Sequence, residues 1–485
     1  MVDMSATLIH HGHIRLLKKA SEYGTVIVGL TTDKEILVKK GYNPELDFES
    51  RKEILKAIKY VDQVVSVPWA LDDSILEKYN IDLLVHGDDN FNNIKKEKLL
   101  IFPRTKGISS TNIRKNVLRT IAQTFKRNVL LNPGPATTTH SVKMAQVIPD
   151  ICPREKEFGD LMEYVSTELT RVVANPKKYT TVLFGGSGTA VVEAVLSSVI
   201  PHDKTVVVVN NGAYGNRVCQ IVNSYKMSYI EFKSSLTKPI DLKKLEKILK
   251  KNKNISHLVM IHNETTTGLL NSLDDFGSLA KKYKVELIVD AMSSYAALPI
   301  DMKKQNIAYL CASSNKNIQG MAGVGFVIAK TKILNKLKNI QPRNFYLNLF
   351  AQYENFIKSH QMRFTPPVQT LYALKQAITE AKEEGIDNRY KRYSNSWIIL
   401  TDGLKKMGLK YLVADLNHSK IITSIFIPLG VDFDEMHDYF HERGFTIYPG
   451  KVSEFNTFRV ANIGEIDSSD IKQFLKLFKI FLSDK

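Results

Sequence analysis

Apolar residues in the first 120 positions fall into short runs that alternate with amphipathic segments. The runs at residues 24–32, 62–68 and 81–89 have the length and composition of buried strands. Segments such as residues 48–60 lie between these runs and carry apolar residues at helical spacing. Because strands that alternate with helices usually pair in parallel, the sequence predicts a small parallel α/β sheet in this region.

The same alternation continues downstream with longer apolar runs, most of which end in small or polar residues. Ligands of doubly wound α/β sheets bind at the carboxyl ends of the strands, so we expect the chemistry of this region at those ends. Residues 366–485 have the pattern of a smaller α+β lobe. The predicted strands of the larger lobe lie at residues 180–186, 205–212, 256–264, 285–294, 308–316 and 323–330.

The boundary between the two α/β regions is expected near residue 124. Residues 112–129 are helical in period and run into a Pro-Gly-Pro sequence at 133–135, which stops regular structure. The predicted divisions are a first domain at 1–124 and a second domain at 125–485, with a large lobe at about 141–365 and a small lobe at about 366–485.

Composition places the chain among globular proteins with more than one domain. It has 485 residues, of which 44% are apolar and 24% are charged. Its apolar runs are all much shorter than the roughly 20 residues that span a bilayer, and its first residues lack the pattern of a signal peptide. The three cysteines are unclustered, which argues against a disulfide framework or a zinc knuckle. We expect a cytoplasmic protein with no membrane partner.

The net charge of +17 could indicate nucleic-acid binding. The lysines are scattered, however, and the densest run, residues 242–254, has helical apolar spacing with lysines on its outer face. A solvated, lysine-rich helix explains that run better than a nucleic-acid surface does. We therefore expect no nucleic-acid partner and interpret the excess charge as suited to anionic small substrates.

The sequence HHGH at 10–13 follows a short first strand and opens a helix. His10 and His13, together with the N-terminus of that helix, form a suitable site for a polyphosphate. Imidazole donors in such a site would stabilise the charge that develops when an α-phosphate is attacked. The motif alone is weak, because paired histidines also cap helices or lie on surfaces.

Two further motifs strengthen this interpretation. The sequence RTKGISSTNIRK, at 104–115, places hydroxyl groups at the start of a helix, which is another anion-binding arrangement. Asp88 or Asp89, after a predicted strand, could orient Mg²⁺ or a ribose, although a plain strand-end turn is the alternative.

In this order, HHGH, GDDN and RTKGISST resemble the motifs of the HxGH-class cytidylyltransferases. The resemblance covers about residues 2–115 and implies a Rossmann-like domain that uses CTP with Mg²⁺ and transfers CMP to a phosphate or phosphonate oxygen. Ala6-Thr7 and Asn90 depart from the residues that this family usually has at these positions. The residues that the resemblance assigns to the CTP phosphates are His10, His13, Arg104, Ser109, Ser110, Thr111 and either Lys39 or Lys40.

A second group of candidate residues follows the strands of the larger lobe. Asp290 ends one strand and could pair with a protonated pyridine nitrogen. Lys316 follows the next strand and is suited to a Schiff base, because small residues and glycines surround it. Either residue alone would more often be an ordinary surface residue, so the assignment depends on further partners.

Three further motifs supply those partners. The glycine-rich turn that enters the helix after residue 186 would cup a phosphate with its backbone N–H groups. Tyr214 lies between glycines, where its ring could stack on a flat heterocycle or simply pack in a loop. Thr265 or Thr266 could form a hydrogen bond to a phenolic oxygen on the same heterocycle. The residues of the phosphate cup are Ser187, Gly188 and Thr189.

This set resembles the class V aminotransferases of fold type I, which use pyridoxal 5′-phosphate. The supporting sequences include LLNPGPATTTHSV, FGGSGTAVVEA, NNGAYGNR, HNETTTGLLN, SSNKNIQGMAGVGFVIA and FRVANIGEI, in family order over residues 129–485. Within the class, the chain is most similar to 2-aminoethylphosphonate–pyruvate transaminases. The resemblance implies a homodimer with active sites at the subunit interface. The roles it implies are the Schiff-base lysine for Lys316, the pyridinium partner for Asp290, the stacking aromatic for Tyr214 and the substrate oxyanion clamp for Arg459.

The two resemblances together imply a bifunctional enzyme. Transamination of phosphonoacetaldehyde, with alanine and pyruvate as the other couple, gives 2-aminoethylphosphonate, and that product could accept CMP from CTP. The alternative is a single-activity transaminase with a non-catalytic, nucleotide-binding N-terminal domain. A nucleic-acid binder with enzyme-like folds is a second alternative, and the absence of basic clusters with interleaved aromatic residues disfavours it.

Overall fold

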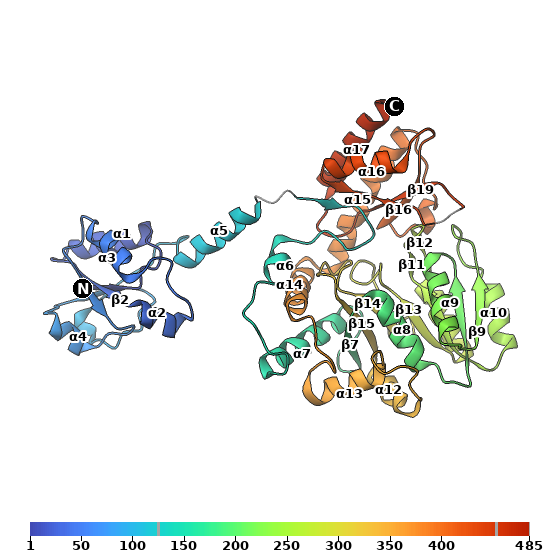
Figure 1. Cartoon of the computed structure of the whole chain (residues 1–485), viewed down its shortest axis with the longest axis horizontal. Helices are drawn as coiled ribbons and strands as arrows, with labels where there is room; N and C mark the ends of the chain where they lie inside the picture. Colours follow the sequence, from blue (N-terminus) through green and yellow to red (C-terminus); the bar gives the residue numbers. More distant parts are fainter. Residues whose placement is uncertain (124–126, 452–453, 485) are drawn as a thin grey trace. The chain divides into compact units, whose positions relative to one another are not determined.

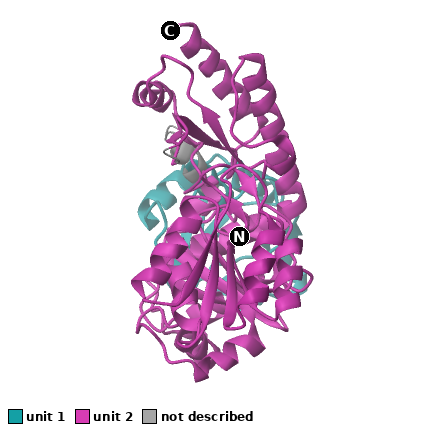
Figure 2. Cartoon of the chain, turned by 90° about the vertical axis from the view of Figure 1, so that its right-hand side faces the viewer, with its two compact units in different colours: residues 1–125 teal, residues 126–485 magenta. Residues whose placement is uncertain are grey.

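The computed structural model describes residues 1–123, 127–451 and 454–484. The chain forms two compact units, Met1–Phe125 and Lys126–Lys485, which are teal and magenta in Figure 2. The boundary expected at residue 124 lies outside the described residues and stays a prediction. No helix within the described ranges is both long enough and apolar enough to span a bilayer.

Unit 1, residues 1–125, is built on a five-stranded parallel sheet. Its elements are β1 (Val2–Met4), α1 (His11–Ser21), β2 (Ile27–Thr31), α2 (Asp33–Lys40), α3 (Phe48–Lys56), β3 (Gln63–Val67), α4 (Asp73–Lys78), β4 (Leu84–Gly87), η1 (Lys96–Lys98), β5 (Leu99–Phe102) and α5 (Ser110–Gln123). The strand order is β3-β2-β1-β4-β5. The chain therefore adds β2 and β3 on one side of β1, then returns and adds β4 and β5 on the other side. A reversal of this kind leaves a crevice for ligands at the carboxyl ends of β1 and β4.

Unit 2, residues 126–485, contains a seven-stranded sheet with the order β7-β15-β14-β13-β10-β8-β9 (Figure 1). Strand β15 is antiparallel to both of its neighbours, and the other pairs are parallel. The elements from residue 140 to 384 are α6 (His140–Met144), α7 (Lys156–Arg171), β7 (Tyr179–Gly185), α8 (Gly188–Val199), β8 (Thr205–Asn210), α9 (Ala213–Ser224), β9 (Tyr229–Lys233), α10 (Leu242–Lys251), β10 (Ile255–Ile261), β11 (Asn263–Glu264), β12 (Leu269–Leu270), α11 (Leu273–Tyr283), β13 (Glu286–Asp290), β14 (Ile307–Ser313), β15 (Val324–Lys330), α12 (Thr331–Leu334), η2 (Asn335–Asn339), α13 (Leu349–Ser359) and α14 (Val368–Glu384).

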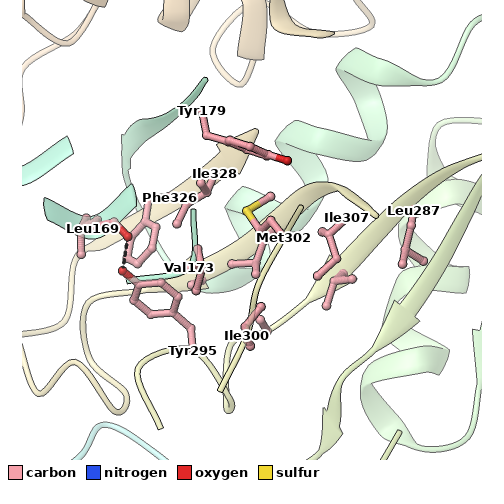
Figure 3. Close-up of a cluster of buried hydrophobic side chains, with 14 of the residues drawn as sticks. Leu169, Val173, Tyr179, Leu287, Tyr295, Ile300, Met302, Ile307, Phe326 and Ile328 are labelled. Atoms are coloured by element: carbon pink, nitrogen blue, oxygen red, sulfur yellow. Dashed lines mark hydrogen bonds between the residues drawn. The ribbon is translucent and has the colours of Figure 1, made fainter. Parts of the chain in front are cut away.

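Both faces of the large sheet are buried, because helices cover each side. Along β8, Val207 and Val209 belong to the core that includes α7, α10, α11 and α14, whereas Val206 and Val208 pack with α8 and α9. Figure 3 shows part of the first core, in which the Tyr295 hydroxyl donates a hydrogen bond of 2.7 Å to the Leu169 carbonyl. This anchor fixes the chain shortly after β13, whose last residue is Asp290.

The C-terminal part of unit 2 forms a smaller lobe around a three-stranded antiparallel sheet, β16-β19-β18. Its elements are α15 (Ile386–Lys406), η3 (Asp415–Asn417), β16 (Ile422–Phe426), α16 (Phe433–Glu442), β17 (Phe445–Thr446), β18 (Tyr448–Pro449), β19 (Thr457–Ala461) and α17 (Ser468–Ser483). A short strand at the start of unit 2, β6 (Val129–Leu130), pairs with β17 and joins this lobe. Helix α14 begins beyond the lobe boundary expected near residue 366 and packs in the core of the large sheet.

Candidate active sites

A cavity of about 530 Å³ opens in unit 1 at the carboxyl ends of β1 and β4. The three motifs of this unit meet there, although the first and the last lie far apart in the sequence. Of the alternatives that the sequence left open, Lys40 and Asp89 line the cavity, whereas Lys39 and Asp88 do not. The motif residues that line the cavity are His10, Gly12, His13, Lys40, Asp89, Arg104, Ser109, Ser110, Thr111 and Arg114.

The imidazole rings of His10 and His13 stack at the start of α1, with centroids 3.9 Å apart. The Gly12 N–H donates to His10 Nδ1 and the His10 N–H donates to His13 Nδ1, both at 3.2 Å. Because Nδ1 of each ring is an acceptor, the proton of each neutral ring is on Nε2. Burial, followed by the charges of His10, Arg104 and Lys40, lowers the pKa of His13 to about 3. Both rings can therefore donate a hydrogen bond from Nε2 without carrying a charge.

Cations and hydroxyl groups surround the two histidines. Arg104 forms a 3.0 Å ion pair with Asp89, and Lys40 donates to the Ser5 hydroxyl at 3.1 Å. Ser109 accepts the Asn112 N–H at 3.1 Å and so caps the start of α5. A helix N-terminus beside two cationic side chains suits a chain of phosphate groups.

Other residues in the wall of the same cavity have different chemistry, and the sequence analysis missed them. Asp3 is 8% exposed, and burial raises the pKa of its carboxyl group. Asn92 donates to its Oδ2 at 3.1 Å, and His86 Nε2 lies 3.6 Å from its Oδ1. The rings of Trp69 and Phe91 also line the cavity and stack with centroids 5.6 Å apart, and Lys40 Nζ lies 5.2 Å from the Trp69 ring. A buried carboxyl group and aromatic faces are groups that can bind a small organic cation.

Arg51 holds the floor of this cavity in place. Its guanidinium is fully buried and donates to the carbonyl oxygens of Ser5 and Thr31, which follow β1 and end β2, at 2.5 and 3.0 Å. It also pairs with Asp33 at the start of α2. A buried guanidinium with several oxygen partners is stable only when the partners are all present, so Arg51 fixes the relative positions of these chain segments.

A second cavity, of about 420 Å³, lies in unit 2 at the carboxyl ends of the parallel strands. It brings together most of the residues expected to bind the cofactor, which come from the segments after β7, β8, β10, β13 and β14. Of the two candidate threonines, Thr265 lines the cavity and Thr266 does not. The expected residues that line the cavity are Ser187, Gly188, Thr189, Tyr214, Thr265, Asp290 and Lys316.

Lys316 and Asp290 have the properties that a pyridoxal phosphate site needs. Burial is the main cause that lowers the pKa of Lys316 to about 8, so the amine loses its proton more readily than an exposed lysine. Lys316 Nζ donates to the Pro133 carbonyl at 2.6 Å. Burial also raises the pKa of Asp290 to about 6, and the Met292 N–H donates to its Oδ1 at 2.9 Å. A buried carboxylate of this kind is stabilised by a cation such as a protonated pyridine nitrogen.

The start of α8 provides the phosphate cup. Ser187 is the N-cap residue, and its side chain forms no capping hydrogen bond, so the first N–H groups of the helix are left for an anion. Gly188 packs against Met292, since a β-carbon at 188 would lie 2.6 Å from Met292 Sδ. Position 188 therefore has room for no side chain larger than that of glycine unless Met292 moves. The observed residues fit pyridoxal phosphate.

Thr266 and Glu264 form a buried support under α9. Thr266 donates its backbone N–H to Glu264 Oε1 at 3.0 Å. Its hydroxyl group donates to the same oxygen and accepts a hydrogen bond from the Ala213 N–H at 3.2 Å. Burial is the main cause that raises the pKa of Glu264 to about 7. Tyr214 lies in the first turn of α9, so this support fixes the aromatic ring that faces the cavity.

Arg459 lies in β19 and is 1% exposed, outside the set of residues that line the cavity. Its Nε donates to the Pro449 carbonyl at 3.0 Å, and its Nη1 lies 3.5 Å from the carbonyl oxygen of Thr265. Burial lowers the pKa of Arg459, and nearby Tyr214 and Glu264 offset part of this effect. Arg459 thus contacts Thr265, which lines the cavity, without lining the cavity itself. Its role as a substrate clamp stays a prediction.

Sequence comparisons with known families cover both units. The family described as "Aminotransferase class-V" matches residues 137–460, and the family described as "Cytidylyltransferase-like" matches residues 6–116. A 2-aminoethylphosphonate–pyruvate transaminase of Bacillus cereus is 39% identical over 351 residues, which is 72% of this chain and 96% of that protein. A bifunctional phosphonoacetaldehyde hydrolase/aminoethylphosphonate transaminase of Clostridioides difficile is 39% identical over 360 residues, and this chain spans 56% of its length.

Solved structures share the fold of unit 2. An alanine–glyoxylate aminotransferase from Nostoc sp. has a TM-score of 0.70 at 22% identity and covers 74% of this chain and 96% of that chain. A ureidoglycine–glyoxylate aminotransferase from Bacillus subtilis has a TM-score of 0.69 at 20% identity, covering 74% and 94%.

The fold of unit 2 is that of fold-type I, pyridoxal phosphate-dependent aminotransferases, and the buried lysine, the strand-end carboxyl group and the start of α8 fit that cofactor. The chain belongs to the class V aminotransferase family and carries a cytidylyltransferase-like region at its N-terminal end. The predicted fold class is confirmed in both units, as are the two resemblances drawn from the sequence motifs.

Proposed function

We propose that the chain is a bifunctional enzyme of phosphonate biosynthesis. Unit 2 interconverts phosphonoacetaldehyde and 2-aminoethylphosphonate with the alanine/pyruvate couple, and unit 1 transfers CMP from CTP to 2-aminoethylphosphonate. The observation that carries the proposal is the buried Asp3 and the Trp69–Phe91 stack, in the same cavity as His10 and His13. That cavity offers partners for an ammonium group as well as for phosphates, and 2-aminoethylphosphonate has both kinds of charge.

The transaminase part is supported by relatives named for this reaction and by the geometry of the second cavity. When bound, pyridoxal phosphate supplies an electron sink that permits amino-group transfer. Asp290 would keep the pyridine nitrogen protonated, and the N–H groups at the start of α8 would hold the phosphate. Tyr214 would supply the aromatic face beside the ring, and Thr265 would supply the hydroxyl group for the phenolic oxygen. Lys316, with its lowered pKa, takes up and returns the proton that moves during the exchange.

In the cytidylyl transfer, a phosphonate oxygen of the acceptor bonds to the α-phosphorus of CTP. The bond from that phosphorus to the bridging oxygen breaks, and pyrophosphate leaves. His10 and His13 donate from Nε2 to the oxygens that gain charge, and Arg104 and Lys40 stabilise the triphosphate. Mg²⁺ would be held by the phosphates with Asp89, since the described residues contain no cluster of three His, Cys, Asp or Glu side chains that could bind a metal alone.

The two activities are linked by one compound, because the amination product of unit 2 is the acceptor of unit 1. This link favours the biosynthetic direction. A cytoplasmic homodimer with its transaminase sites at the subunit interface is part of the proposal. The alternative is a single-activity transaminase in which unit 1 binds nucleotide without turning it over.

The test supplies phosphonoacetaldehyde, alanine, CTP and Mg²⁺ to wild type and to Lys316→Ala. Wild type should form CMP-linked 2-aminoethylphosphonate. Lys316→Ala should form it only when 2-aminoethylphosphonate is added, because no other amine lines the cofactor cavity. Wild type that releases no pyrophosphate with any phosphonate or phosphate monoester would leave the single-activity alternative.

A further inference from the structure

Positive charge surrounds the ring of Tyr214 in the transaminase cavity. Arg217 Cζ lies 5.0 Å from the ring centroid and Lys451 Nζ lies 5.4 Å from it. Arg459 is also close to this ring, since the Tyr214 side chain offsets part of the lowering of the pKa of Arg459 by burial. The charges of Arg459, Lys451 and Arg217 all lower the pKa of Lys316, so the three cations share the space around the reactive amine.

The acidic groups near this ring already have partners. Asp290 accepts the Met292 N–H and is the expected partner of the pyridine nitrogen, and Glu264 is held by Thr266. The cofactor phosphate has its own partners at the start of α8. Because uncompensated positive charge in a cavity is costly, the cations around Tyr214 favour binding of a second anion, and the substrate is the molecule that brings one.

Arg459 and Lys451 belong to one hairpin but differ in access. Arg459 is 1% exposed, and its Nε donates to the Pro449 carbonyl at 3.0 Å. The adjacent Gly450 N–H donates to the Thr457 carbonyl at 2.8 Å, so the β18–β19 turn is anchored up to this point. Lys451 follows directly and is exposed. It is therefore the cation of the hairpin that an incoming anion meets first.

We propose that Lys451 is a second substrate-binding cation of the transaminase site and that it favours phosphonate over carboxylate substrates. The inference rests on the aminoethylphosphonate activity proposed for unit 2. A phosphonate has three oxygens and up to two negative charges, whereas a carboxylate has two oxygens and one. The phosphorus is also one bond further from the amine-bearing carbon than the carboxylate carbon of alanine. One guanidinium can serve both groups, and the flexible Lys451 amine reaches the additional charge that only the phosphonate has.

The test measures each half-reaction separately in the cofactor-loaded protein, with 2-aminoethylphosphonate or with alanine as the amino donor. Lys451→Met keeps the length of the side chain and removes its charge. It should raise the KM for 2-aminoethylphosphonate about tenfold, because the substrate loses one charged contact with an exposed side chain. The KM for alanine should change less than about twofold. Lys451→Arg should restore phosphonate binding.

Lys375→Met is the matched control, because Lys375 is also exposed and its Nζ lies 5.7 Å from the ring of Tyr164. It should leave both half-reactions unchanged. An equal loss with both donors in Lys451→Met would show a general structural role and overturn the inference, as would no loss with either donor.

Unreactive analogues separate this inference from the proposed function. Ethylphosphonate and propionate lack the amine, and their competitive inhibition constants against alanine report anion binding alone. Lys451→Met should weaken ethylphosphonate about tenfold and propionate little. Wild type without turnover of 2-aminoethylphosphonate would refute the proposed substrate, while these two constants would still confirm or refute the role of Lys451.

Discussion

Gly134 lies directly against Lys316, since a β-carbon at position 134 would stand 2.2 Å from Lys316 Nζ. The backbone φ of Gly134 is +125°, which residues with a side chain rarely adopt. We therefore expect Gly134→Ala to displace the lysine amine and to reduce the bound pyridoxal phosphate. The measurement is the visible absorbance per mole of chain that borohydride removes.

Gly24→Ala provides the control for backbone strain. Gly24 has a φ of +137°, and a β-carbon there would meet no atom within 4 Å. This variant should lose roughly 1 kcal/mol of stability and keep its cofactor. Full cofactor absorbance in Gly134→Ala would show that the lysine amine has another position available.

His13→Ala should lower the rate of cytidylyl transfer by about 10²–10³-fold, the usual cost of removing one preorganised donor to developing charge. Transamination should be unchanged, because no residue of the His13 motif lines the second cavity. His11→Ala is the control, since His11 is exposed and lies outside the first cavity. Pyrophosphate release measures the first activity and pyruvate formation the second. Equal losses in the two variants would contradict the assigned role.

Asp3→Asn and Phe91→Ala should each weaken binding of the acceptor and leave CTP binding nearly unchanged. The first removes the charge of the buried carboxyl group and the second removes an aromatic face of the cavity wall. Trp69 is kept, because Lys40 Nζ lies 5.2 Å from its ring and Lys40 is assigned to the triphosphate. A KM for 2-aminoethylphosphonate raised about 10- to 100-fold is expected from the loss of one charged or cation–π contact. The opposite pattern, a raised KM for CTP alone, would place the nucleotide base beside these residues instead.

Glu264→Gln should change how the stability of unit 2 depends on pH. The carboxyl group has a pKa of about 7 in the folded unit and an ordinary value of 4.5. Between these values the folded unit holds a proton that the unfolded chain releases, so Glu264 makes stability fall as pH rises. The glutamine keeps the neutral shape. Relative to wild type, the variant should gain up to about 3 kcal/mol as the pH rises from about 5 to 8.

Urea unfolding followed by Trp397 fluorescence measures this effect. The chain has two tryptophans, so a Trp69→Phe background leaves Trp397 as the reporter of unit 2. Glu383→Gln, an exposed substitution of the same kind, should show the pH dependence of wild type. A Glu264→Gln curve parallel to wild type would mean that Glu264 is ionised in the folded unit throughout this range.

The position of candidate residues could be predicted from sequence where the signal was local. Asp290 and Lys316 follow apolar runs that form β13 and β14, and the carboxyl-end rule placed both residues in one cavity. The glycine-rich turn before α8 has a local signal of the same kind.

Asp3 and the two aromatic rings of the first cavity had no such signal. Asp3 lies inside β1 and comes near His86 because β1 pairs with β4, with Val2 opposite Val85. Trp69 and Phe91 meet through the fold of segments 22 residues apart. The choice of Thr265 over Thr266 likewise depends on the turn after β11, where Thr266 is held by Glu264. The first two relationships are long-range, and the third depends on the local conformation of the turn; spacing along the chain encodes neither.

In the proposed function, one chain makes an aminophosphonate and activates it with CTP. The most direct measurement is a phosphorus NMR spectrum of wild-type protein incubated with CTP, Mg²⁺ and 2-aminoethylphosphonate. We expect equal amounts of pyrophosphate and of a product in which the phosphonate phosphorus is coupled to the phosphorus of CMP. An unchanged spectrum under these conditions, from protein that still transaminates 2-aminoethylphosphonate with pyruvate, would contradict the proposed function.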